Sequence, residues 1–231
     1  MDSWSFMKKI FYFLVLFVFS TLAQASLSQT TLIYKAKGGS KVDFFQIFTI
    51  EKLADGYLIK IKFTDKGELD REHEVIVGAN FETTKWKFRS LKTGLTIDAY
   101  KKDDSIFLTG LKNGKKTEKV FDLKKKMWIE LFPTGLENFS LSSDKKIEFW
   151  SIGIEGPGEM NIGEFVAKRK GSESFVLTDS KKVEAELVTL TFNDWKSVLW
   201  SGKSWHRKSD GRVLAIEVGR EIGTWELVSE K

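Results

Sequence analysis

The chain has 231 residues, of which 42% are hydrophobic and 30% are charged, with a formal net charge of +5 and only two prolines. This composition is typical of a globular protein. The chain has no cysteine and two histidines. Disulfides, thiol nucleophiles, thiolate zinc sites and lipid attachment to an N-terminal cysteine are therefore excluded, and a histidine-rich metal centre is disfavoured. We expect neither a metal site nor a cofactor.

The first 25 residues predict an export signal. Lys8 and Lys9 precede residues 10–19, a run of ten uncharged apolar or aromatic residues, and Ala23-Gln24-Ala25 follows as a small-x-small cleavage site. Charge, apolar run and small residues come in the order that a signal peptide requires. The apolar run is too short for a comfortable membrane span. We expect cleavage near Ala25 and a periplasmic or secreted mature chain of 206 residues. An uncleaved N-terminal anchor is the alternative.

Residues 30–125 predict about eight β-strands. Apolar and polar residues alternate with a period of two over residues 57–64, 85–89 and 95–100, which is typical of strands with one buried face. Asp55-Gly56 and Asn113-Gly114 lie between such runs and predict tight hairpin turns. Residues 42–50 are apolar on both faces, so we expect that strand to be covered on both sides.

The middle of the chain, residues 127–158, interrupts this rhythm. Pro133 and Gly135 predict a loop, residues 136–141 one helical turn, and residues 147–152 a further strand. Asn193 is a candidate cap for a short helix over residues 194–199. The last part of the chain returns to strands, which we predict at residues 164–168, 174–177, 183–192, 202–207, 212–218 and 224–228.

These patterns predict an all-β fold. We expect residues 26–231 to form a single antiparallel β domain, a strongly curved meander that is half-barrel or barrel-like, with at most one or two short helices. Two half-domains that meet near residues 127–146 are the alternative.

Seven tryptophans remain in the mature chain, and five of them lie between residues 128 and 205. Curved β-sheets can hold ligands in their concave interiors, so these side chains are candidates for lining a cavity for an acyl chain or a sugar. Core packing is the default alternative, since strands are enriched in aromatic residues that bury large areas. The candidate ligand-binding residues are Trp128, Trp150, Trp200 and Trp205.

A basic segment covers residues 112–126. This segment contains seven lysines and two acidic residues, which gives a net charge of +5 within fifteen residues. Attraction to a membrane or another anionic surface is one interpretation, and a solvated hairpin whose lysines prevent edge pairing is the other. Nucleic acid is not an expected partner of an exported protein. The candidate surface residues are Lys115, Lys116, Lys119, Lys124, Lys125 and Lys126.

The other polar candidates do not predict catalysis. Ser204, His206 and Asp210 lie close in sequence, but a triad is defined by geometry, and the second glycine of a nucleophile elbow is missing. His73 shares a strand face with apolar residues, which indicates a partly buried structural role. Glu72 and Glu74 share the opposite face, where a polar outer surface is favoured over a cation site.

Residues 204–217 have a recognisable shape, with an aromatic strand, the turn Ser209-Asp210-Gly211 and an apolar strand. With the signal peptide and the long meander, the chain resembles uncharacterised bacterial envelope β proteins. It is also similar to the periplasmic lipoprotein-carrier superfamily, whose members fold as a curved antiparallel half-barrel over a hydrophobic cavity. This resemblance implies a fold and an apolar ligand, and it assigns no functional residue.

We therefore expect an exported, non-enzymatic periplasmic protein that binds an apolar or amphipathic ligand or an envelope partner. A small outer-membrane β-barrel is the first alternative, because a lipid-facing strand also alternates with a period of two. An envelope hydrolase is the second, although no pair of convergent carboxylates is evident.

The export prediction has a direct test. If residues 1–25 are removed on export, the chain recovered from the periplasmic or secreted fraction begins at Ser26. Intact mass spectrometry of that fraction measures the mature terminus. A full-length chain recovered from the membrane pellet would support the uncleaved anchor instead.

Overall fold

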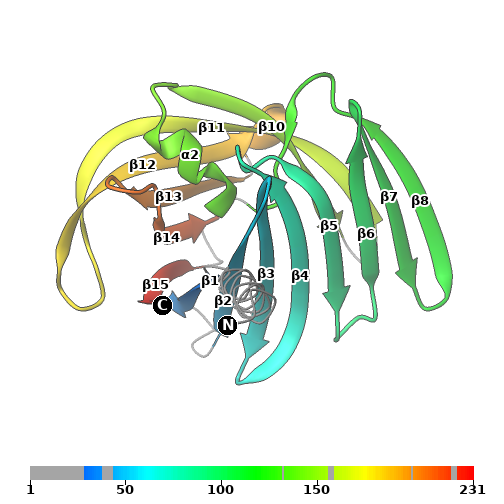
Figure 1. Ribbon diagram of the computed structural model, residues 1–231, viewed down its shortest axis with the longest axis horizontal. Helices are drawn as coiled ribbons and strands as arrows, with labels where there is room; N and C mark the ends of the chain where they lie inside the picture. The colour runs from blue at the N-terminus through cyan, green and yellow to red at the C-terminus, as the bar shows by residue number, and fades with distance from the viewer. Residues whose placement is uncertain (1–28, 38–43, 132, 156–158, 199, 220–222) are drawn as a thin grey trace, which may run out of the picture.

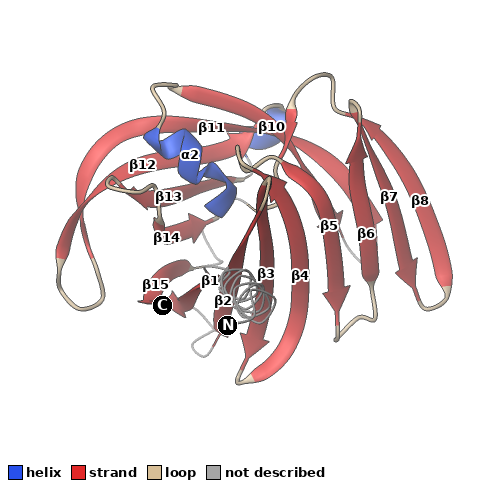
Figure 2. Ribbon diagram, in the orientation of Figure 1, coloured by secondary structure: helices blue, strands red, loops and turns tan. Residues whose placement is uncertain are grey.

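The computed structural model describes residues 29–37, 44–131, 133–155, 159–198, 200–219 and 223–231. The predicted signal peptide lies outside the described residues. The described residues contain fifteen strands, which form one sheet with a few short helical turns (Figures 1 and 2). The all-β prediction is confirmed.

The first half of the chain is a meander of eight strands, the number that the sequence predicts. They are β1 (Gln29–Lys37), β2 (Phe44–Leu53), β3 (Gly56–Asp65), β4 (Glu68–Gly78), β5 (Thr83–Ser90), β6 (Thr96–Lys102), β7 (Ser105–Lys112) and β8 (Lys115–Asp122).

The second half begins with a short strand and a helical segment and then returns to a meander. Its elements are β9 (Met127–Trp128), the 3₁₀ turn η1 (Thr134–Leu136), α2 (Glu137–Leu141), β10 (Lys146–Glu155), β11 (Glu159–Val176), β12 (Lys182–Phe192), the 3₁₀ turn η2 (Trp195–Val198), β13 (Ser201–Arg207), β14 (Val213–Val218) and β15 (Thr224–Glu230).

The first and last strands of the chain pair with each other in the middle of the sheet. The strand order runs from β8 down to β1, then from β15 down to β9, so β8 and β9 form the two edges although they are neighbours in sequence. All pairs are antiparallel except β9 with β10, which is parallel. The sheet is strongly curved, as Figure 1 shows, and among the described residues its edge strands β8 and β9 do not pair with each other.

The turn between β7 and β8 illustrates how local sequence sets the register. Asn113 and Gly114 both have positive φ, 50° and 78°, as a type I′ turn requires, and Lys112 pairs with Lys115 directly beside them. This turn matches the sequence prediction.

The two edges of the sheet meet through side chains. Met160 of β11 is buried against Gly110 of β7, where an added Cβ would lie only 2.4 Å from the methionine Cε. Lys119 of β8 donates to the carbonyl oxygen of Met160, and Trp150 Nε1 donates to the carbonyl oxygen of Leu123 at 2.8 Å. The inner faces of β7 and β8 therefore pack on β10 and β11, and this contact takes the place of a barrel-closing strand pair.

Helix α2 packs against the sheet near β12 to β14 (Figures 1 and 2). Leu136 and Phe139 join a buried cluster with Phe149 and Phe165. At Gly211, with φ +75°, an added Cβ would lie 2.6 Å from the carbonyl oxygen of Glu137, so a larger residue there would displace the helix. Within the described part of the chain, no helix is long and apolar enough to cross a membrane.

Three local predictions differ from the structure. The two strands predicted at residues 164–168 and 174–177 are one strand, β11, in the structure. Its register shifts between Arg169 and Gly171. This β-bulge lets the strand continue through a glycine that, from the sequence, would be expected to end it. The helix predicted over residues 194–199 is the shorter η2, and Leu199 lies outside the described residues. On β2, Phe45 and Ile47 face outward and stay partly exposed, so the cover predicted for both faces is incomplete among the described residues.

The seam between the two sheet edges should contribute strongly to stability. We expect Met160→Ala to lower the free energy of unfolding by about 2–5 kcal/mol, because it leaves a cavity at a buried site. Val120→Ala on β8, where the side chain is 62% exposed, should change it by less than about 0.5 kcal/mol. Urea denaturation of both variants measures the difference, and equal effects would contradict a packed seam.

Candidate ligand-binding cavity

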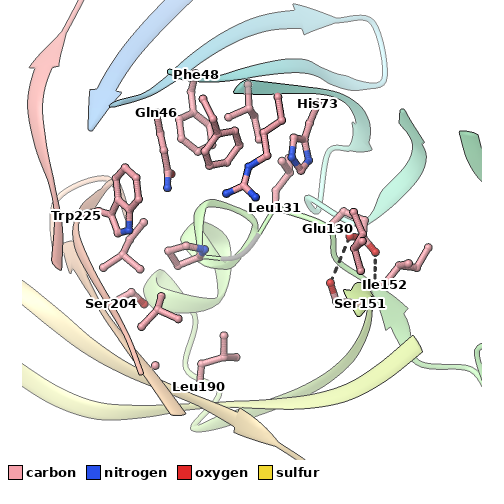
Figure 3. A pocket seen from close by; sticks show the side chains of 18 of the residues that line it. Gln46, Phe48, His73, Glu130, Leu131, Ser151, Ile152, Leu190, Ser204 and Trp225 are labelled. Atoms are coloured by element: carbon pink, nitrogen blue, oxygen red, sulfur yellow. Dashed lines mark hydrogen bonds between the residues drawn. The ribbon is translucent and has the colours of Figure 1, made fainter. Parts of the chain in front are cut away.

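The curved sheet encloses a cavity of about 410 Å³, within the range of small-molecule sites. Figure 3 shows Gln46, Phe48 and His73 on one wall, from β2 and β4, and Leu190, Ser204 and Trp225 opposite them, from β12, β13 and β15. Glu130 and Leu131, which follow β9, and Ser151 and Ile152 of β10 complete the lining.

Most of the lining is apolar. The inward positions of the strands supply it because alternate side chains of a strand face the same side. Its larger apolar members include Phe48, Ile61, Phe63, Trp200, Ile216 and Trp225. The polar members are few, and three of them, Arg71, His73 and Glu130, are ionisable groups with limited exposure to solvent.

Glu130 is a buried carboxyl group with neutral donors around it. It accepts hydrogen bonds from the backbone nitrogen of Ile152 at 2.6 Å, from Trp128 Nε1 and, at 3.4 Å, from Ser151 Oγ. Burial raises the pKa of Glu130 to about 8, and these hydrogen bonds oppose the rise. The group is therefore largely protonated at neutral pH.

His73 is neutral because burial disfavours its charged form as well. Burial, together with the nearby charge of Arg71, lowers the pKa of His73 to about 3. Trp86 Nε1 donates to His73 Nδ1 at 3.2 Å, so the neutral ring carries its hydrogen on Nε2. The predicted structural role of His73 on a partly apolar face agrees with this packing between Phe63, Trp86 and Phe88.

Arg71 carries the positive charge of this wall. It precedes His73 by two residues on β4, so the two side chains share the inward face. The guanidinium carbon lies 4.4 Å from the centre of the Phe63 ring. Register pairs Gln46 with Phe63 and Phe63 with Arg71, which places Gln46 and Arg71 in one row on either side of the ring.

The four candidate tryptophans do not gather at this cavity. Trp200 is part of the lining. Trp128 is fully buried beside Glu130, and Trp150 bonds to the carbonyl oxygen of Leu123 at the seam. Trp205 lies near the surface, where its ring packs on Phe175 and its Nε1 donates to Glu173. Trp128, Trp150 and Trp205 are therefore not among the residues that line this cavity. Ligand binding by the four tryptophans stays a prediction.

The six candidate lysines do not form one patch. Lys115 and Lys116 begin β8, whereas Lys124 and Lys125 follow its other end, about 25 Å away for a strand of this length. Lys119 turns inward to the carbonyl oxygen of Met160.

Lys126 is also engaged within the protein, where it forms ion pairs with Glu148 and Glu164. Contact of the six lysines with an anionic surface stays a prediction, and the internal contacts of Lys119 and Lys126 make these two less available for it.

The residues around His206 do not assemble a triad. Ser204 Oγ lies 2.8 Å from His206 Nε2, but His206 Nδ1 faces the carbonyl oxygen of Gly211 at 3.0 Å. The carboxylate of Asp210 instead binds Arg207 at 2.9 and 2.6 Å. His206 is fully buried and its pKa is lowered by that burial to about 4. These contacts fasten β13 to its turn.

Glu72 and Glu74 lie on the outer face of β4, as the sequence predicts. Each is placed between two cationic residues by the strand register, Glu72 between Lys62 and Arg89 and Glu74 between Lys60 and Lys87. Cross-strand pairs of opposite charge stabilise a sheet and leave these carboxylates poorly suited to a hard cation. No cluster of three metal-ligating side chains occurs in the described ranges.

No protein-family model matches the chain, and no curated protein matches it. A solved structure from Brucella abortus is similar in fold: a beta-barrel-like protein of the domain of unknown function DUF1849. The match has a TM-score of 0.54 and 12% sequence identity, and it covers 89% of this chain and 97% of that chain. At this identity the likeness shows a shared barrel-like β fold alone. It does not test the similarity to lipoprotein carriers.

Arg71, Gln46 and Glu130 are candidate site residues that were not predicted from the sequence. A signal was present for the first two, because each interrupts an otherwise apolar inward face: Gln46 between Phe44 and Phe48, and Arg71 before His73 and Val75. Glu130 follows the two-residue strand β9, where no alternation is long enough to assign a face.

Glu130 should make stability depend on pH. The unfolded chain releases this proton near pH 4.5 and the folded chain near pH 8, so the folded state loses stability as pH rises between these values. We expect Glu130→Gln to remove a slope of up to about 1.4 kcal/mol per pH unit. Urea denaturation from pH 5 to pH 8 measures it. The exposed Glu118→Gln should follow the wild type, and parallel curves for wild type and Glu130→Gln would contradict the assignment.

Proposed function

We propose that this chain is a non-enzymatic protein of the bacterial cell envelope that binds an apolar or amphipathic ligand inside its curved sheet. The observation that carries the proposal is the apolar cavity of about 410 Å³. Concave, mostly apolar spaces of this size with a few polar groups are typical of small-ligand sites, so this cavity favours an occupant.

The envelope location rests on the export signal in residues 1–25. The similarity of residues 204–217 to lipoprotein carriers adds support, because that resemblance implies a curved sheet over a hydrophobic cavity. The Brucella protein adds the fold and no function, since its description gives none.

Two rival functions receive less support. An outer-membrane barrel needs an apolar outer band, whereas the outward positions of β3, β4 and β5 carry the charged ladder of Glu72 and Glu74 and their cationic neighbours. For an envelope hydrolase, the sequence offered Ser204, His206 and Asp210, and the carboxylate of Asp210 is directed to Arg207.

The cavity can be tested by filling it. Val218 lines the cavity and is half-buried, whereas Val228 is 44% exposed and lies outside the lining. We expect Val218→Trp to weaken binding of the apolar fluorescent probe 1-N-phenylnaphthylamine at least tenfold, because the indole occupies the space that the probe needs. Val228→Trp, the matched control, should bind as the wild type does. Fluorescence titration measures both affinities.

Circular dichroism should show that both variants keep the fold. Failure of the wild type to bind the probe, or equal binding by wild type and Val218→Trp, would contradict the proposal.

A further inference from the structure

The cavity wall holds a cation that no neighbouring acid neutralises. Arg71 is largely buried, and burial lowers its pKa while Asp70 beside it in sequence opposes the shift. The buried Nε of Arg71 has no hydrogen-bond partner, and none of the ion pairs found among the described residues includes its guanidinium. A cation that is largely shielded from water is normally paired with an acid or another hydrogen-bond acceptor.

The acidic residues near Arg71 already pair with other cations. Asp70 lies 3.5 Å from Lys92, and Glu217 lies 3.2 Å from Lys203. Glu130 faces the same cavity but is held as a neutral acid by its burial. Since His73 is also neutral, the cavity wall keeps one net positive charge at neutral pH.

The other nearby polar groups can donate hydrogen bonds. Gln46 stands in the same cross-strand row as Arg71, and His73 is the next inward residue on β4 with its hydrogen on Nε2. The guanidinium of Arg71, the amide of Gln46 and the imidazole of His73 are all hydrogen-bond donors, and such a set is suited to binding an oxyanion. Apolar side chains line the rest of the cavity, among them Ile216 and Trp225.

We propose that the cavity selects single-chain amphiphiles with an anionic head group, whose oxyanion pairs with Arg71 and whose chain lies along the apolar wall. This inference rests on the proposed function and specifies the chemistry of its ligand. Carboxylate and phosphate head groups both present the oxyanion that Arg71 can pair with. The apolar chain distinguishes such ligands from free anions.

The wild-type protein can test the head-group preference without any variant. Laurate, dodecyl phosphate and 1-dodecanol have chains of the same length, and each is titrated as a competitor against bound 1-N-phenylnaphthylamine. We expect both anions to displace the probe at concentrations at least tenfold lower than the neutral alcohol. Inorganic phosphate, which has no chain, should displace nothing. The ratio between laurate and dodecyl phosphate then assigns the head as carboxylate or phosphate.

Arg71→Gln should remove the preference by weakening both anions at least tenfold and leaving 1-dodecanol unchanged. Arg71→Lys keeps the positive charge but not the two-pronged guanidinium geometry. It should therefore lose less affinity for the two anions than Arg71→Gln does. Arg89→Gln is the matched control, because Arg89 lies on the outer face of β5 near Glu72. It should behave as the wild type.

Two results would overturn the inference: equal displacement by laurate and 1-dodecanol in the wild type, or an unchanged anion preference in folded Arg71→Gln. In either case, continued binding of the probe would leave the proposed function standing. Absence of binding by the probe and by all three amphiphiles would overturn the proposed function as well.

Discussion

The structure depends on one constraint, which is that most strands of a fifteen-stranded meander have an apolar face to bury. Eight strands already enclose a barrel whose interior the side chains can just fill. Rolling fifteen strands encloses more volume than the inward side chains occupy. The chain fills part of this volume by folding β7 and β8 onto β10 and β11, and another part with α2 and its cluster. The candidate ligand-binding cavity lies between β2–β5 and β12–β15, with residues after β9 and on β10 in its lining.

The polar groups in that cavity differ in how they adapt to burial. Glu130 and His73 become neutral, one by keeping its proton and the other by losing it. A guanidinium has a pKa too high to follow them, so Arg71 remains a cation. The wall therefore has a charge that the fold itself does not compensate, next to a surface that prefers hydrocarbon. This combination is the physical basis for an amphipathic anionic ligand.

Local patterns in the sequence were sufficient for much of the fold. Alternation with a period of two predicted the eight strands of the first half, and Asn113-Gly114 predicted a turn that has the required positive φ at both positions. The way the sheet rolls up was harder to predict from the sequence, because contacts between residues far apart in the chain, such as Gly110 and Met160, determine it. The tryptophans show the same limit: residue type alone did not separate Trp200, which lines the cavity, from Trp128 and Trp150. Arg71 could have been identified from the sequence, since its inward position follows from the alternation of β4.

Native mass spectrometry of the wild-type protein, expressed with its predicted signal sequence and purified without detergent, detects a bound ligand directly. If the cavity carries an anionic amphiphile, the folded protein has an adduct that is released on denaturation, and the released molecule ionises in negative mode as a single-chain lipid. The Arg71→Gln protein, purified in the same way, should carry less of it. A folded wild-type protein whose mass equals that of the bare polypeptide would contradict the account.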